Sequence, residues 1–292
     1  MSLSQVFYLL FYLLYYSHIT LMVLAMVLTG SISAVLYGQI KWQAILLVGL
    51  STYFTYSLDN LIDWKRDLTR YQKIQELVQI YHKVTYLLIP TAAVGILILT
   101  FVSSNEFRIG ILLLGAAVAM GTTRFSIYRE NSSSPSQSIL SFVLNRLFIT
   151  TIWTTVCVFL PIWYYNSEII SRTWNAFIYI FCLIFPYAVL WKIESSVELL
   201  QKKILGSIIM RVLVSFPIIS MIIVMIDVIT DASPIVNLFN LIPPIAIITA
   251  LIIIVRNANE LRKKISLLTI ILILLCSLSA LMHLIFGIFL IS

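Results

Sequence analysis

Charged residues are scarce in this chain. Asp, Glu, Lys and Arg together make up 11% of its 292 residues, whereas 61% of the residues are hydrophobic. Because about a quarter of the residues in soluble globular domains are charged, this composition excludes that class. The long apolar runs instead have the length, roughly 20 residues, that an α-helix needs to cross a lipid bilayer. We therefore expect an all-α integral membrane protein.

Cysteine and histidine are also few. The three cysteines all lie inside apolar segments, and the three histidines are scattered along the chain. An odd number of buried cysteines gives no disulfide framework, and neither residue type occurs with the spacing of metal ligands. Residues 1–5 contain no basic residue, and no small-residue cleavage site follows them, so no removable signal peptide is expected.

Nine apolar segments are candidate membrane spans. They are residues 19–37, 43–58, 84–102, 107–123, 145–164, 176–191, 207–226, 235–255 and 267–290. Of the 19 Lys and Arg residues, 16 fall in, or within five residues of, the connections that follow the second, fourth, sixth and eighth of these segments. The positive-inside rule then predicts a cytoplasmic N-terminus and an external C-terminus. The net charge of +7 is thus mainly a topology signal, and we expect no nucleic-acid partner.

A group of aspartates follows the second segment. Asp59, Asp63 and Asp67 are spaced i, i+4 and i+8, with Asn60 beside them, so in a helix they share one face. Like charges at this spacing repel, which indicates a cation on that face. Mg²⁺ takes oxygen ligands and is commonly held by carboxylates together with substrate phosphates. The pattern predicts a metal and diphosphate site; the alternative is a solvated polar turn beside a membrane span.

A second acidic pair follows the sixth segment. Glu194 and Glu198 lie 131 residues after Asp63 and Asp67, and each pair closes the second helix of a set of four. This offset predicts one transmembrane domain, 1–292, with two related halves, about 1–123 and 145–255, and a last helix at 267–290. Both acidic pairs would then lie on the same face of the membrane and converge on one cavity, where acidic groups are functional candidates.

These residues resemble the UbiA superfamily of intramembrane prenyltransferases. That family has nine membrane helices around a central cavity, a first motif Asn-Asp-x-x-Asp-x-x-x-Asp and a second motif that is often Asp-x-x-Asp-x-x-x-Asp. The first motif appears here as Asp59-Asn60-Leu61-Ile62-Asp63-Trp64-Lys65-Arg66-Asp67, with its opening pair in swapped order. In the second motif, Trp191 replaces the leading aspartate, and Glu194 and Glu198 replace the others.

The resemblance implies an Mg²⁺-dependent enzyme that uses a prenyl diphosphate. The catalytic residues would be Asp63, Asp67, Glu194 and Glu198, and the metal ligands Asp59, Asn60, Asp63, Asp67, Glu194 and Glu198. The residues implied to bind substrate are Asn60, Arg66, Arg70, Arg124, Lys192, Lys202, Tyr56, Tyr187 and Trp191. Because glutamate has a longer arm than aspartate, a second metal would be held differently here, or lysines would contact the diphosphate in its place.

Aromatic residues near the predicted cytoplasmic mouth could shield an allylic carbocation through cation–π attraction. They are Tyr53, Tyr56, Trp153, Tyr187 and Trp191, and ordinary packing or interfacial roles are the alternative for each. Three functions are open, and they differ in the group that reacts with the cation. The first is transfer to an aromatic or other lipophilic acceptor, the second is cyclisation by a membrane terpene synthase without an acceptor, and the third is lipid binding without catalysis.

Overall fold

A computed structural model describes residues 18–37, 40–70, 75–105, 107–111, 135–164, 171–192, 203–230 and 239–256, with Ile271 and Leu275. At several helix ends, including 59–70, it describes the backbone alone. Every regular element in this part of the chain is a helix, which confirms the all-α prediction for it. The elements are α2 (Ile19–Tyr37), α3 (Trp42–Arg70), α4 (Gln75–Val102), α6 (Pro135–Tyr164), α7 (Ser171–Lys192), α9 (Lys203–Thr230), η3 (Phe239–Leu241) and α11 (Ile242–Arg256).

The connection between the second and third predicted spans is largely helical. The second predicted span ends at residue 58 and the third begins at residue 84, but the helices that contain them extend further. Helix α3 continues to Arg70 and α4 already begins at Gln75. The segment contains neither Gly nor Pro and is rich in Leu, Lys, Arg, Gln and Glu, which favour continuation of a helix beyond its apolar part.

Two helical segments among the described residues are long and apolar enough to cross a membrane, Lys83–Val102 and Val143–Tyr164. Shorter apolar stretches lie in α2, α7 and α9. The predicted span 107–123 is described only as far as residue 111, where it is helical, and in 267–290 only Ile271 and Leu275 are described, also as helix. Nine membrane crossings therefore stay a prediction.

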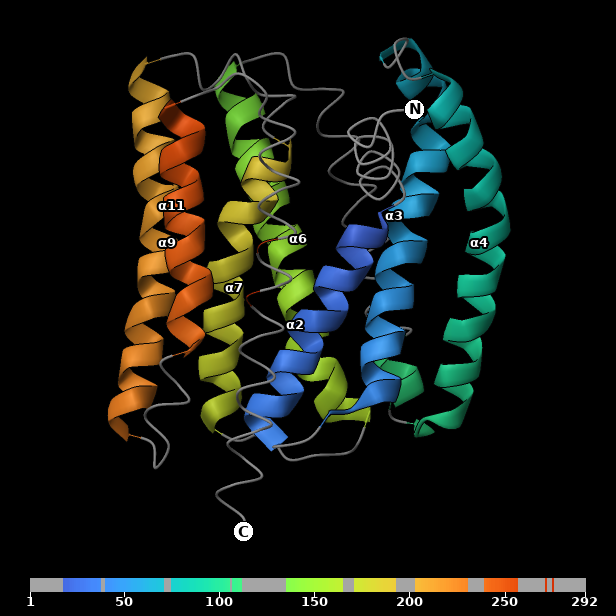
Figure 1. Ribbon diagram of the computed structural model, residues 1–292, viewed down its shortest axis with the longest axis horizontal. Helices are drawn as coiled ribbons and strands as arrows, with labels where there is room; N and C mark the ends of the chain where they lie inside the picture. The colour runs from blue at the N-terminus through green and yellow to red at the C-terminus, as the bar shows by residue number, and fades with distance from the viewer. Residues whose placement is uncertain are drawn as a thin grey trace, which may run out of the picture.

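The helices stand side by side with alternating directions (Figure 1). Helix α3 packs between α2 and α4, and α7 packs between α6 and α9, with α11 against α9 and α7. The two groups meet where α2 contacts α6 and α7, and where α3 contacts α6. One end of the bundle, called the motif end below, carries the ends of α3, α7 and α11 and the starts of α4, α6 and α9 (Figure 1).

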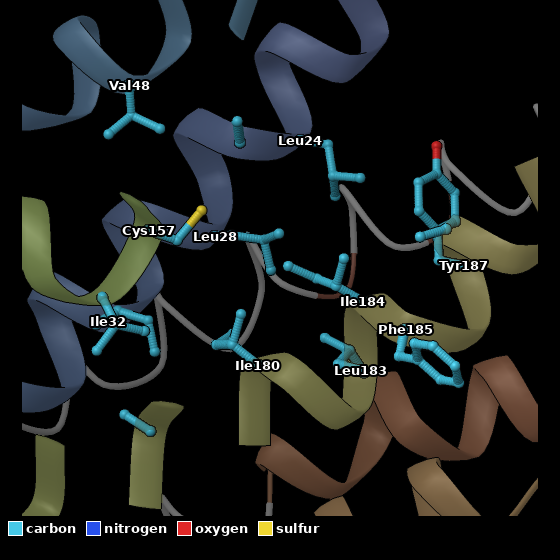
Figure 2. Packing of buried hydrophobic residues seen from close by; sticks show 14 of the residues in the cluster. Leu24, Leu28, Ile32, Val48, Cys157, Ile180, Leu183, Ile184, Phe185 and Tyr187 are labelled. Carbon is cyan, nitrogen blue, oxygen red and sulfur yellow. The ribbon is translucent and has the colours of Figure 1, made fainter. Parts of the chain in front are cut away.

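The core lies where these two groups of helices meet. Figure 2 shows Leu24 and Leu28 of α2 near Ile180 and Ile184 of α7, and Cys157 contributed by α6. All five side chains are at most 4% exposed. Burying a leucine or isoleucine completely contributes roughly 1.5–3 kcal/mol, in water, relative to leaving it exposed. In lipid this term is small, so close packing between the helices has the larger part.

A glycine allows α2 and α3 to approach closely. A Cβ atom at Gly49 would clash with the Cγ and Sδ atoms of Met26 on α2. On the other side of α3, a Cβ atom at Gly95 of α4 would lie 2.8 Å from Leu50. Small residues at such crossings are typical of helices that pack within a membrane.

The outer helices expose apolar side chains. On α4, Leu87 and Phe101 are 73% and 71% exposed, and only 11% of the apolar window Lys83–Val102 is buried. Helix α9, at the opposite edge of the bundle in Figure 1, exposes Ile222 and Ile229 in the same way. A core helix of a soluble protein would be mostly buried, so these outer faces have the character of surfaces that contact lipid.

Arg108 closes the end of α4 that is opposite to the motif end. Its guanidinium donates hydrogen bonds to the backbone carbonyls of Thr100, Phe101 and Ser103, at 3.3 Å for Thr100 and 3.1 Å for Ser103. It also donates to Oδ1 of Asn105. The last carbonyls of a helix have no partner within the helix, and a basic side chain here satisfies them and complements the helix dipole. One of the few basic residues on the predicted external side thus has a structural role.

Candidate functional site

The aspartates of the first motif lie on an unbroken helix. Residues 59–70 form the last three turns of α3, which confirms the helical interpretation of the stretch that contains Asp59, Asp63 and Asp67. With a rise of 1.5 Å per residue, the three aspartates span about 12 Å along the helix. They occupy one face and approach the motif end together with Asn60, Arg66 and Arg70.

The part of α3 just before the aspartates contacts α6 through Tyr56. Its hydroxyl oxygen accepts a hydrogen bond of 3.0 Å from the indole N–H of Trp153 on α6. The two rings meet edge to face, with centroids 6.1 Å apart. Residues 56, 60, 63 and 67 recur at helical spacing, so Asn60, Asp63 and Asp67 extend the face on which Tyr56 contacts α6. The carboxylate face thus continues from a partly buried contact between two helices.

His18 joins this pair from the start of α2. Its ring centroid lies 5.6 Å from that of Tyr56, and its carbonyl accepts a hydrogen bond from the N–H of Met22 in the first turn of α2. His18 has φ of 52°, which is uncommon for a residue other than glycine. Backbone strain of this kind occurs preferentially at functional sites, where the surrounding packing maintains it. The sequence alone gives no sign of this contact, because the three histidines are scattered along the chain.

Helix α6 presents a polar stripe on the side that holds Trp153. Arg146, Thr150 and Thr154 are buried at spacings of four, and Arg146 is only 6% exposed. The hydroxyl of Thr150 donates to the carbonyl of Arg146, and that of Thr154 donates to the carbonyl of Thr150, both at 2.8 Å. These bonds satisfy the hydroxyls within the helix, as expected in an apolar interior.

Arg146 is buried, although the positive-inside rule groups it with the connection that follows the fourth predicted span. The predicted span 145–164 already contained it. An ionisable residue inside a predicted span is a functional candidate by default, and this signal was sufficient to identify it.

The C-terminal part of α7 leads toward the second predicted motif. Tyr187 is 4% exposed near the C-terminal end of this helix, and Figure 2 shows it near Leu24 of α2. The backbone continues as helix through Trp191 to Lys192 and ends at the motif end (Figure 1). The last turns of α3 and α7 therefore approach the same end of the bundle, and the two related halves stay a prediction.

Four predicted site residues lie outside the described residues: Arg124, Glu194, Glu198 and Lys202. For Asp59, Asn60, Asp63, Arg66, Asp67, Arg70, Trp191 and Lys192, the description covers only the backbone. Among the described residues, no group of three or more His, Cys, Asp or Glu side chains could hold a metal ion, and the side chains of the first motif are not part of that set. The metal-site prediction thus stays a prediction.

No protein-family model matches its sequence, and neither a curated protein nor a solved structure shows significant similarity to it.

Proposed function

We propose that this protein is an integral membrane enzyme that uses a prenyl diphosphate with Mg²⁺ and transfers the prenyl group to an aromatic or other lipophilic acceptor. In this proposal nine helices surround a central cavity, the motif end faces the cytoplasm together with the N-terminus, and the C-terminus lies outside. The prenyl tail enters from the bilayer between the helices. Its diphosphate head stays at the motif end, because an unpaired charge is excluded from the apolar interior.

One observation carries the proposal. The aspartates lie on a continuous helix. They share a face of this helix with Tyr56, which contacts Trp153 of α6. In the alternative interpretation, a solvated turn, the aspartates would be in a flexible connection without a preferred direction. A helical face that continues from a partly buried contact between two helices instead supports carboxylates turned toward the bundle, where acidic groups indicate function.

The residues of the first motif fit Mg²⁺ by their chemistry. Asp59, Asn60, Asp63 and Asp67 offer only oxygen ligands, which this hard cation prefers, and carboxylates on one helix face need a cation to reduce their mutual repulsion. We assign Glu194 and Glu198 as the carboxylates that complete the site from the end of α7. Bound Mg²⁺ would neutralise the diphosphate and stabilise it as a leaving group.

The other predicted site residues bind the diphosphate or shield the allylic cation. Arg66, Arg70, Arg124, Lys192 and Lys202 are assigned to the diphosphate oxygens. The rings of Tyr56 and Trp153, together with Tyr187 and Trp191, would exclude water from the allylic cation and stabilise it by cation–π attraction. The hydrogen bond between Trp153 and Tyr56 supports this assignment, because it holds the two rings in a defined orientation.

An assay of pyrophosphate release tests the proposal. The protein, purified and reconstituted in lipid nanodiscs, is incubated with Mg²⁺ and prenyl diphosphates of several chain lengths, with and without lipophilic aromatic acceptors. Release that depends on an acceptor, with a prenylated product, is the expected result. Release without an acceptor, with a hydrocarbon or terpene alcohol as product, would instead identify a terpene synthase. No turnover under any condition would contradict both and favour a lipid-binding role.

A further inference from the structure

Three buried hydroxyl groups lie together between α3 and α4. They belong to Tyr53 and Ser57, which are one turn apart on α3, and to Thr85 on α4. The hydroxyl of Tyr53 lies near those of Ser57 and Thr85. All three side chains are at most 4% exposed. None of the three oxygens, however, has a partner at hydrogen-bond distance and angle among the described residues.

The packing of α3 against α4 brings these residues to the same region of the bundle. The two helices lie side by side and run in opposite directions (Figure 1). They approach closely at Gly95 of α4, where a Cβ atom would lie 2.8 Å from Leu50 of α3. Tyr53 and Ser57 follow Leu50 toward the motif end. Thr85 precedes Gly95, which on the antiparallel α4 is also toward the motif end.

Other hydroxyls in the helices have a partner within their own helix. Those of Thr55 on α3 and Thr91 on α4 donate to the carbonyl four residues earlier, at 2.8 and 3.1 Å. The buried Thr29 of α2 does the same at 2.8 Å. Ser57 and Thr85 also lie inside helices, but their hydroxyls do not make this bond. The difference indicates that these two hydroxyls serve a contact between helices rather than their own backbone.

A water molecule fits this group of hydroxyls. Leaving a buried hydroxyl without a hydrogen bond is costly, most of all in a protein surrounded by lipid. An internal water typically makes about three hydrogen bonds to buried polar groups that lack other partners. A divalent metal ion is disfavoured, because Mg²⁺ and Ca²⁺ are usually held by charged carboxylates, whereas these three groups are neutral.

We propose that the hydroxyls of Tyr53, Ser57 and Thr85 bind one internal water molecule that bridges α3 and α4. A hydroxyl can both donate and accept, as water does, so a single water can bond to both helices at once. The water holds α3 to α4 on one face, and the bond between Tyr56 and Trp153 holds it to α6 on another. Polar contacts thus fix the part of α3 that leads to the aspartates from two sides. The inference does not depend on the proposed function.

Water-edited solid-state NMR on the full chain in liposomes tests the inference. Magnetisation is transferred from water to isotope-labelled threonine side chains, and Thr85 is compared with Thr29, whose buried hydroxyl has its partner in its own helix. We expect early transfer to Thr85 and none to Thr29. Tyr53→Phe and Ser57→Ala each remove one hydroxyl of the site and should abolish most of the transfer to Thr85. Thr55→Val removes a hydroxyl that already has a partner, so this matched control should leave the transfer unchanged.

Three results would overturn the inference. Absence of transfer to Thr85 in the wild type would mean that the three hydroxyls bond to one another without water. Equal transfer in the wild type, Tyr53→Phe and Ser57→Ala would mean that the water is not held by these hydroxyls. An equal loss in Thr55→Val would mean that the effect is not specific to the site. Should Tyr53→Phe not fold, Ser57→Ala and the comparison of Thr85 with Thr29 in the wild type still decide the question.

Discussion

The indole N–H of Trp153 donates a hydrogen bond of 3.0 Å to the hydroxyl oxygen of Tyr56, joining two helices that are 97 residues apart in sequence at this point. The bond links α3 to α6 just before the turns of α3 that carry the aspartates. It fixes the position of this part of α3 relative to α6.

Removing the bond should weaken the bundle modestly. Tyr56→Phe and Trp153→Phe each delete one partner, and interhelical hydrogen bonds in membrane proteins contribute about 0.6 kcal/mol on average. We expect a coupling free energy of about 0.5–1.5 kcal/mol in a double-mutant cycle, measured by reversible unfolding in mixed micelles. Additive effects of the two variants would mean that the hydroxyl and the indole are not partners in the membrane.

Asp63→Ala should abolish Mg²⁺-dependent pyrophosphate release and leave the protein folded. The residue lies in the part of α3 beyond the Tyr56–Trp153 contact, so its loss removes a carboxylate without opening the apolar core. Turnover is measured in nanodiscs, with folding checked by circular dichroism and size-exclusion chromatography. Asp63→Asn, which retains the shape of the side chain, should be nearly as inactive. Wild-type turnover in either variant would refute the metal assignment.

Gly49→Ala should destabilise the protein, because the added methyl group clashes with Met26 across the α2–α3 contact. Overpacking of this kind typically costs about 1–3 kcal/mol. The matched control is Gly110→Ala, where the nearest atom to the new methyl group is a carbon of Trp163 at an ordinary 3.8 Å. Thermal unfolding in detergent should show a lower midpoint for Gly49→Ala only. Met26→Ala should partly rescue it, and an unchanged midpoint in Gly49→Ala would disprove the close packing.

Leu97→Lys tests whether the exposed face of α4 contacts lipid. Leu97 is 55% exposed in the middle of the apolar segment Lys83–Val102. A lysine at the centre of a membrane helix costs about 2.5–3.5 kcal/mol on insertion scales, so membrane-inserted yield should fall strongly. Leu97→Ile is the control and should behave as wild type. If α4 instead faced water, the lysine would raise the soluble yield, and this outcome would overturn the membrane assignment.

Several features of this protein were determined by local sequence alone. The helix at 19–37 agrees residue for residue with α2, because a continuous apolar run bounded by polar residues leaves a helix as the only way to satisfy its backbone in lipid. The helical face of Asp59, Asp63 and Asp67 followed in the same way from their spacing of four. The ends of the helices did not follow from the apolar pattern. The polar residues after the second predicted span continue α3 because they favour a helix, whereas the apolar run stops before them.

Tertiary structure alone decided which helices meet. No pattern in the chain pairs Tyr56 with Trp153, brings His18 against them or buries Arg146, because such contacts depend on how whole helices pack and tilt against one another. The position of Arg146 inside a predicted span can be read from the sequence, whereas its burial depends on how the helices pack. The spacing of residues along a helix is set by its backbone geometry. Which helix packs against a given face depends instead on the shapes of all the side chains between the two helices.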